Sequence, residues 1–321
     1  MKKLFIKGLL ALTTLSGLLQ YFLLPGLVWS IGFPFLQILL MVIGFKYYRG
    51  NKSLKICSLL LALLFLTEIG FSFYSKLNIR TSGVSTEIKV MSYNLFFKNS
   101  RPNQVISIIK NNDPDLLFVQ ELTPQWAREL ENSLGARYKY KKLYPLRGTH
   151  GIGIFSKFKL NEQKLLNNLA KKPYAQIVVA TINDKKIQLI NTHLASPAIA
   201  VENQDEFFSL FTRNYQVRKA QIIELNKLAQ DDGSKYNSQL LVGDLNTLHS
   251  EPLFKRLKLS WTYSNNGFLR WMKFNFPNSA KIPPIMTLDY ILGRGKMKFI
   301  ESKVIEGGSS DHLAIMTKLK I

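Results

Sequence analysis

The chain has 321 residues, enough for one sizeable core with additional elements. It carries 43 Lys and Arg against 21 Asp and Glu, a formal net charge of +22, and most of this excess lies after residue 75. Such a charge favours an anionic partner (nucleic acid, a phosphorylated small molecule or an anionic lipid surface), although a generally lysine-rich proteome gives the same balance. The single cysteine, Cys57, excludes an intramolecular disulfide.

The N-terminal part is apolar enough to enter a membrane. No residue in the run 8–45 is charged, whereas one membrane-spanning helix needs only roughly 20 residues. A Pro-Gly pair interrupts the run and predicts two spans, Leu4–Leu24 and Leu27–Phe45, and a third span follows over Ile56–Tyr74. Residues 1–75 are therefore predicted to be a membrane anchor of about three spans.

Two questions about this anchor stay open. The first run follows Lys2 and Lys3, as in a signal peptide, but it lacks a clear cleavage site of small residues and more spans follow. Because basic residues stay in the cytoplasm, three spans place the rest of the chain outside it, and a single crossing by the first run reverses this orientation. Glu68 is expected near the membrane interface rather than as a functional carboxylate inside the bilayer. The sequence thus predicts a multi-pass cell-membrane protein with an extracytoplasmic C-terminal domain.

After a polar linker over residues 76–86, apolar strands and amphipathic helices are interleaved. The predicted strands are Ile88–Asn94, Asp115–Val119, Gly151–Phe155, Ala175–Thr181, Lys186–Asn191, Gln239–Val242, Thr287–Leu292 and Leu313–Leu319. The predicted helices are Gln104–Asn111, Pro124–Leu134 and Asn214–Gln230. This order lacks a strict repeat of one strand and one helix, so it predicts a mixed sheet arrangement with helices outside, in one domain over residues 87–321.

One segment, Leu240–Thr247, delivers polar groups to the open end of an apolar strand. Because side chains alternate along a strand, Asp244 and Asn246 are expected to point the same way. The carboxylate suits orienting or deprotonating a water, and the amide suits holding a phosphate oxygen. The other interpretation is a strand-ending turn, in which Asp and Asn are common.

Residues of the same chemistry recur at or near the ends of other predicted strands. Ligands of sheet proteins bind where strand ends meet, so these residues are expected to form one polar cluster at one rim. They are Asn94, Glu121, His193, Asp244, Asn246, Asp289, Asp311 and His312.

The ordered motifs around these residues resemble the endonuclease/exonuclease/phosphatase superfamily, which includes deoxyribonucleases, apurinic-site endonucleases, sphingomyelinases and inositol-polyphosphate phosphatases. The motifs are Ser92-Tyr93-Asn94, Val119-Gln120-Glu121, Asn191-Thr192-His193-Leu194, Gly243-Asp244-Leu245-Asn246, Leu288-Asp289-Tyr290-Ile291 and Ser310-Asp311-His312. No single motif is specific, but together they occur in the family's order. The resemblance covers about residues 86–321 and implies a four-layer α/β/β/α sandwich.

The resemblance also implies roles at the rim. Glu121 would ligate Mg²⁺ or Mn²⁺, hard cations that prefer carboxylate oxygens, and Asn94 and Asp311 would complete or support that position. Asp244 would orient or deprotonate the attacking water, and Asn246 would hold a non-bridging phosphate oxygen.

The two histidines would contact the phosphate, one of them protonating the leaving oxygen. Asp289 would pair with His312, fixing its tautomer and raising its pKa. The alternatives are a hydrogen-bonded histidine at a strand start and a lone carboxylate in an edge strand. The sequence does not show whether His193 or His312 is the one that protonates the leaving oxygen.

The roles of several other residues stay open. Arg218 and Gln221 lie one turn apart on a predicted helix, where Arg218 either reaches the site or braces that helix. His150 either touches substrate or is a turn histidine. Phe96 stands where many members of the superfamily carry a polar residue, which argues against an apurinic-site repair enzyme.

Two aromatic-basic segments, residues 206–213 and 267–281, either face the substrate as loops or complete the core. Stacking on bases and contact with a lipid headgroup layer are both compatible with their composition.

The sequence as a whole predicts a membrane-anchored, Mg²⁺-dependent phosphoric-ester hydrolase, a nuclease-like phosphodiesterase that uses water to attack phosphorus. Its substrate would be a phosphodiester of nucleic acid or of a lipid headgroup. The alternatives are a sphingomyelinase-like phosphodiesterase of lipids or small molecules, a membrane-tethered binding module without catalysis, and a surface protein that binds nucleic acid.

Overall fold

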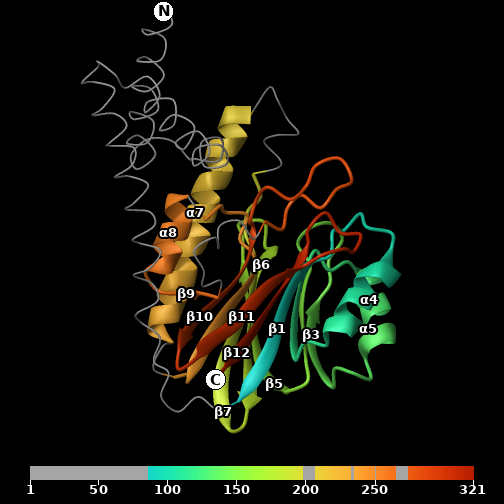
Figure 1. Cartoon of the computed structure of the whole chain (residues 1–321). Coiled ribbons are helices and arrows are strands. Elements are labelled where there is room, and N and C mark those ends of the chain that lie inside the picture. Colours follow the sequence, from blue (N-terminus) through green and yellow to red (C-terminus); the bar gives the residue numbers. More distant parts are fainter. Residues whose placement is uncertain (1–85, 198–206, 233–234, 250, 265–273) are drawn as a thin grey trace, which may run out of the picture. The chain divides into compact units, whose positions relative to one another are not determined.

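The computed structural model describes residues 86–197, 207–232, 235–249, 251–264 and 274–321 (Figure 1). The predicted membrane anchor and nearly all of the predicted linker lie outside these residues. Among the helices that are described, none combines the length and the apolar character needed to cross a membrane.

Two six-stranded mixed sheets form the described domain. The first has the order β11-β12-β1-β2-β4-β3, with β11 Lys298–Ile305, β12 Ala314–Lys320, β1 Glu87–Asn94, β2 Leu116–Gln120, β4 Ile152–Ser156 and β3 Tyr140–Tyr144. The second has the order β5-β6-β7-β8-β10-β9, with β5 Lys159–Asn167, β6 Pro173–Ile182, β7 Lys185–His193, β8 Ser238–Asp244, β10 Asp289–Gly295 and β9 Thr262–Tyr263. The pairs β1–β2 and β7–β8 are parallel, and the other pairs are antiparallel.

The main hydrophobic core lies between the two sheets. Phe118 and Ile154 of the first sheet belong to the same buried cluster as Leu189 and Leu240 of the second. This packing explains why the central strands are apolar along most of their length: one face meets the other sheet, and the opposite face is covered by helices.

Helices cover the outer faces of the sheets. The helices α4, Pro102–Asn112, and α5, Pro124–Leu134, share a second core with the outer face of the first sheet. Thr123 caps α5 by accepting a hydrogen bond from the Trp126 N–H at 3.1 Å. The long helix α7, Phe207–Asp231, lies over the second sheet, where Tyr174 of β6 donates to Glu224. A shorter helix, α8, spans Pro252–Lys258.

The structure confirms the α/β fold with mixed sheets, and every strand and helix predicted for residues 87–321 is present. Four strands were missed, namely β3, β5, β9 and β11, and they are the four edge strands. Their side chains are largely exposed or half-buried, so they lack the apolar run that marks a central strand.

The segment 206–213 was interpreted wrongly as a loop, because α7 begins at Phe207. Phe211 is 7% exposed and lies at helical spacing from the buried Arg218, Ile222 and Leu225. It therefore continues the inner stripe of α7. Most of the other aromatic-basic segment, residues 265–273, lies outside the described residues.

The two sheets are joined by a buried amide. Asn191 of β7 donates from Nδ2 to the carbonyl oxygens of Val119, at 3.0 Å, and Gly153, at 2.9 Å. Its Oδ1 accepts from Gln120 Nε2 at 2.8 Å. One side chain of the second sheet thus makes three hydrogen bonds to β2 and β4 of the first.

We predict that Asn191→Leu destabilises the protein by about 3 kcal/mol, because it removes three buried hydrogen bonds, to the Gln120 amide and to two backbone carbonyls. Chemical denaturation of the full chain in detergent would measure this loss. The matched control is Asn161→Leu on edge strand β5, where a half-buried amide donates only to Thr181 Oγ1 at 3.1 Å. Its expected cost is below about 1 kcal/mol. Equal losses in the two variants would contradict the cross-sheet role.

Candidate active site

Strand ends bring the predicted residues to one rim of the two sheets. The register places Asn94 of β1 beside Gln120 of β2, whose next residue is Glu121. In the second sheet, Asp244 of β8 lies between His193 of β7 and Asp289 of β10. All eight predicted residues lie at this rim, including Asp311 and His312 in the loop before β12 and Asn246 just after β8.

Asn94 connects the sheets at this rim. Its Nδ2 lies 3.3 Å from Glu121 Oε1 and 3.2 Å from Asp244 Oδ2. The second oxygen of Glu121 accepts the Phe97 N–H at 2.9 Å. Glu121 has a φ of 56°, a conformation that costs about 1–3 kcal/mol for a residue other than glycine. The fold therefore holds this carboxylate in place at an energetic cost, as is common at functional sites.

The close approach of β7 to β8 requires Gly243. Its φ is 141°, and a Cβ atom there would lie only 2.0 Å from the Thr192 carbonyl oxygen. The glycine of the Gly243-Asp244 motif thus lets Asp244 pair directly with His193.

Asp244 is buried and surrounded by donors. Its Oδ1 accepts the backbone N–H of Asn246 at 2.8 Å, and its Oδ2 lies 3.5 Å from His193 Nε2 and 3.8 Å from His312 Nε2. Burial raises the pKa of Asp244, as does the charge of Asp289, while the two histidines oppose the shift. A raised pKa makes this carboxylate a better proton acceptor near neutral pH than an ordinary aspartate.

Asn246 reaches the rim in a different way from the one predicted. It lies beyond the last residue of β8 and has a φ of 47°, so strand alternation does not set its direction. Its Nδ2 donates to the Leu194 carbonyl at 3.0 Å. This bond still leaves one amide hydrogen for a ligand.

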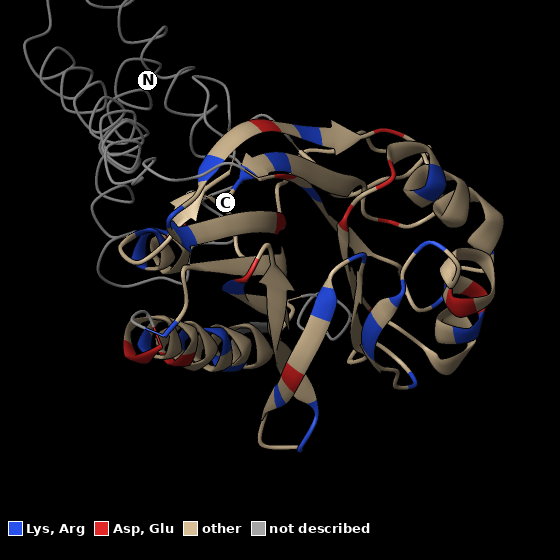
Figure 2. Cartoon of the chain, turned by 90° about the horizontal axis from the view of Figure 1, so that it is seen from below, with Lys and Arg blue, Asp and Glu red and all other residues tan. Residues whose placement is uncertain are grey.

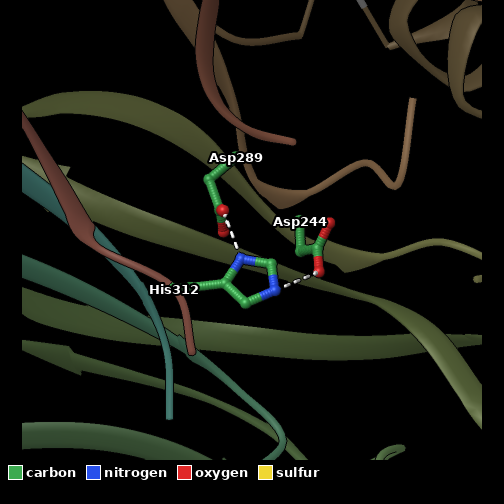
Figure 3. Close-up of side chains that lie close together, drawn as sticks. All are labelled: Asp244, Asp289 and His312. Atoms are coloured by element: carbon green, nitrogen blue, oxygen red, sulfur yellow. Dashed lines mark hydrogen bonds and ion pairs between the residues drawn. The ribbon is translucent and has the colours of Figure 1, made fainter. Parts of the chain in front are cut away.

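His312 lies between two carboxylates (Figure 3). Its Nδ1 is 2.7 Å from Asp289 Oδ2, and its Nε2 faces Asp244. Burial alone would lower the pKa of His312, but the charges of Asp289 and Asp244 and the hydrogen bond to Asp289 raise it to about 10. The imidazole is therefore a cation at neutral pH, with both ring nitrogens acting as donors.

The loop before β12 joins His312 to the first sheet. Ser310 Oγ donates to the Asn94 carbonyl at 2.6 Å and accepts the His312 N–H at 3.1 Å. Burial raises the pKa of the neighbouring Asp311 to about 6; His312 opposes the shift, and the charges of Glu121 and Asp244 add to it. Glu121, Asp244 and Asp311 thus form a group of carboxylates that repel one another.

The loop between β3 and β4 orients the other histidine. His193 Nδ1 lies 3.0 Å from the Thr149 carbonyl oxygen, which fixes this nitrogen as a donor and turns Nε2 toward Asp244. Burial lowers the pKa of the adjacent His150, and the charges of His193 and Lys172 lower it further. His150 is thus close to the site, and its contact with substrate stays a prediction.

Arg218 and Gln221 both form hydrogen bonds with the backbone of Ala195, two residues after His193. Arg218 Nη1 donates to the Ala195 carbonyl at 3.0 Å, and Gln221 Oε1 accepts the Ala195 N–H at 3.0 Å. Of the two interpretations of Arg218, these contacts favour bracing: α7 fixes the backbone just after the histidine.

Two sets of residues are candidates for holding a metal ion. Ligand atoms of Asp244, Asp289 and His312 lie within 4.8 Å of one another. However, His312 Nδ1 lies 2.7 Å from Asp289 Oδ2, so that the imidazole and this carboxylate already satisfy each other. This set suits hydrogen bonding.

In the other set, Glu121 and Asp311 offer carboxylate oxygens, which are the donors that Mg²⁺ prefers. Asn94 supports this set rather than completing it, because its Oδ1 accepts the Phe96 N–H at 3.0 Å and its Nδ2 faces Glu121. The repelling carboxylates around it also favour a divalent cation. The two carboxylates therefore fit the predicted metal, with Asn94 in a supporting position.

A side chain that contacts the site, that of Asn275, was missed. Asn275 donates a side-chain hydrogen bond to Asp289 Oδ2. It lies in the segment 267–281, for which the sequence predicted a role only for the aromatic and basic residues. Neither spacing nor composition distinguishes this asparagine from others in the chain.

Comparisons with known proteins agree with this geometry. Residues 91–312 match the model of the Endonuclease/Exonuclease/phosphatase family. Among curated proteins, no sequence matches this chain.

Solved structures similar to this chain have low sequence identity. Truncated TDP2 of Caenorhabditis elegans is 21% identical, with a TM-score of 0.58 over 73% of this chain and 98% of that one. TDP2 of D. rerio, in complex with a single-strand DNA product, is 17% identical, with a TM-score of 0.59 over 74% of this chain and 100% of that one. An endonuclease/exonuclease/phosphatase of Bacteroides vulgatus is 12% identical, with a TM-score of 0.58 over 74% and 100%. At these identities the likeness shows the fold.

The two metal-binding sets predict opposite results for two variants. Glu121→Gln is expected to weaken Mn²⁺ binding by at least about tenfold, because it removes the charged ligand. Asp289→Asn is expected to leave binding within about threefold, because it changes only the partner of His312. Titration of the full chain with Mn²⁺, followed by electron paramagnetic resonance, would measure both. Binding lost in Asp289→Asn and kept in Glu121→Gln would assign the metal to the Asp-Asp-His group instead.

Proposed function

Because this chain belongs to the endonuclease/exonuclease/phosphatase family, we propose that it is a membrane-anchored, Mg²⁺-dependent phosphodiesterase that hydrolyses nucleic-acid phosphodiesters with water. The observation that carries this proposal is the convergence of Glu121, Asp244 and the Asp289–His312 pair at one rim. Family membership supports a metal-dependent phosphoester hydrolase in general. The metal, the substrate class and the anchor are the parts that we add.

Glu121 and Asp311, supported by Asn94, would hold the cation, which supplies positive charge to the phosphate oxygens and makes the phosphorus more electrophilic. The carboxylates of this set repel one another without it. Asn246 would add a neutral donor to a non-bridging oxygen through its remaining amide hydrogen. These groups would position the ester and offset its charge.

Asp244 would accept the proton of the attacking water. Burial raises its pKa, the Asn246 N–H holds its Oδ1, and its Oδ2 faces the rim, where Asn94 Nδ2 lies 3.2 Å away. A base of raised pKa removes a proton at neutral pH more effectively than an exposed aspartate does.

The two histidines would have different roles, one in stabilising charge on the phosphoryl group and the other in protonating the leaving oxygen. His312 stays protonated because of Asp289 and Asp244, so its Nε2–H would stabilise the negative charge that develops on the phosphoryl oxygens. A group that holds its proton this firmly is a poor acid. That leaves His193, whose Nε2 also faces Asp244, as the residue that would protonate the leaving oxygen.

A polyanionic substrate agrees with the charge of the chain, +22 overall. Figure 2 shows Lys and Arg spread over strands of both sheets and over the helices. One similar structure, TDP2 of D. rerio, is a complex with a single-strand DNA product. These observations favour nucleic acid over a small neutral ester.

A lipid phosphodiester is the second candidate, and an exposed apolar loop favours it. Ile282 and Ile285 are 51% and 44% exposed on either side of two prolines. The same hairpin places the Phe276 ring 4.7 Å from the His312 ring. Isoleucines beside a reaction site suit the surface of a bilayer, and the predicted anchor would keep the domain near one.

We place the protein in the cell membrane as a multi-pass protein, with the hydrolase domain outside the cytoplasm, on the basis of its apolar spans and their flanking basic residues. Protease treatment of intact cells would test this: cleavage within residues 87–321 is expected. Full protection until the cells are broken would reverse the orientation.

The function is tested on the full chain in detergent, with single-strand and plasmid DNA, sphingomyelin and bis-p-nitrophenyl phosphate as substrates. We expect Mg²⁺-dependent cleavage of DNA and of the small diester, and complete loss on chelation. Asp244→Asn should lower kcat by about 10³-fold, since it removes the base. The control Asp184→Asn, at the exposed β6–β7 turn, should retain full activity.

Cleavage of sphingomyelin alone would replace nucleic acid by the lipid candidate. Metal binding without hydrolysis of any ester would support a binding module instead. Full activity of Asp244→Asn on every hydrolysed substrate would refute the proposed base.

A further inference from the structure

Asn275 is a buried asparagine outside every motif identified in the sequence. Its side chain and backbone make hydrogen bonds in four directions. The backbone N–H donates to the Met286 carbonyl at 2.8 Å, and the backbone carbonyl accepts the Leu313 N–H at 2.8 Å. The side-chain Oδ1 accepts the Leu288 N–H at 3.0 Å, and Nδ2 donates to Asp289 Oδ2.

These partners surround the Asp289–His312 pair. Leu288 directly precedes Asp289, and Leu313 directly follows His312. One residue thus fixes the backbone beside both members of the pair and also contacts the carboxylate itself.

The contact with Asp289 bears directly on His312. Both donors to this carboxylate, Asn275 Nδ2 and His312 Nδ1, meet the same oxygen, Oδ2. Within the described part of the chain, the other oxygen, Oδ1, is buried without a hydrogen-bond partner. The terminal torsion of an aspartate is soft, so the carboxylate orientation depends on the donors that it meets.

The chemistry of the donor also matters. An amide donates a hydrogen bond without adding a charge, so the negative charge of Asp289 stays available to the His312 imidazolium. A lysine or arginine at position 275 would hold the carboxylate equally well but would compete with His312 for its charge. Asn275 orients Asp289 and leaves its charge to His312.

We propose that Asn275 is a positioning residue for phosphoester hydrolysis: it sets the orientation of Asp289, and through Asp289 it directs His312 Nε2 at the phosphate. This inference rests on the proposed function and adds a residue to it. Asn275 touches neither the water nor the ester. Its effect is expected in kcat and not in metal binding.

The first test is a double-mutant cycle on the full chain in detergent, with bis-p-nitrophenyl phosphate and Mg²⁺. Asn275→Leu is similar in size to the native residue, and Asn275→Ser is a second variant in case Leu prevents folding. Each is expected to lower kcat by about tenfold with KM and Mn²⁺ affinity within about twofold. In the Asp289→Asn background the same substitutions should change kcat by less than about twofold, because the charged Asp289–His312 pair through which Asn275 acts is already lost.

Asn278→Ala is the matched control. Asn278 lies in the same hairpin, and its Nδ2 donates to the Ser310 carbonyl at 2.9 Å, but it has no contact with Asp289. If Asn275 merely stabilised the hairpin, both variants would lower kcat to the same extent, and both losses would persist in Asp289→Asn. That result would overturn the inference.

A second measurement does not depend on turnover. The chain has only 4 histidines, so selective ¹⁵N-histidine labelling gives few signals, and His312→Ala identifies that of His312. The Nδ1 proton held by Asp289 is expected far downfield in the native chain and broadened by exchange in Asn275→Leu. An unchanged signal would overturn the inference. If the native chain cleaves no ester, the proposed function fails, and this measurement still decides whether Asn275 positions the pair.

Discussion

Buried amides that cross between the sheets hold the site together. Asn191 makes three hydrogen bonds from β7 to β2 and β4 in the middle of the core, and Asn94 reaches both Glu121 and Asp244 at the rim. Apolar packing between sheets is non-directional and tolerates sliding, whereas an amide fixes the register because its donors and acceptors match in only one position. Every distance between residues of different sheets depends on this register.

The sequence predicts the centre of the fold much better than its edges. Strands such as β2 and β8 are buried on both faces and appear as apolar runs, whereas β5 and β11 show exposed polar positions that resemble loops. An edge strand is defined by its partner, and its own composition is shaped by the need to avoid further pairing. Phe211 shows a related limit: it lies on the buried side of α7, which is visible only after the helix is placed.

The residues of the site also differ in how well the sequence predicts them. Its charged members could be predicted because each stands at the end of an apolar strand within a short motif, as Asp244 and His312 do. The groups that orient them could not. The Thr149 carbonyl holds His193, and Asn275 holds Asp289, across 44 and 14 positions of sequence. A backbone carbonyl has no sequence signature, and one asparagine in an aromatic segment resembles any other.

The orienting groups share a property that explains their chemistry. Asn94, Asn275 and the Asn246 backbone all donate to carboxylates, and all are neutral. Lysines in these places would compensate the carboxylates in advance and weaken the attraction for a divalent cation and for the charge on His312. Neutral donors instead satisfy the oxygens while the group keeps its negative charge. In the proposed reaction, that charge is what binds the metal, keeps His312 protonated and makes Asp244 a base, so one arrangement of amides supports all three tasks.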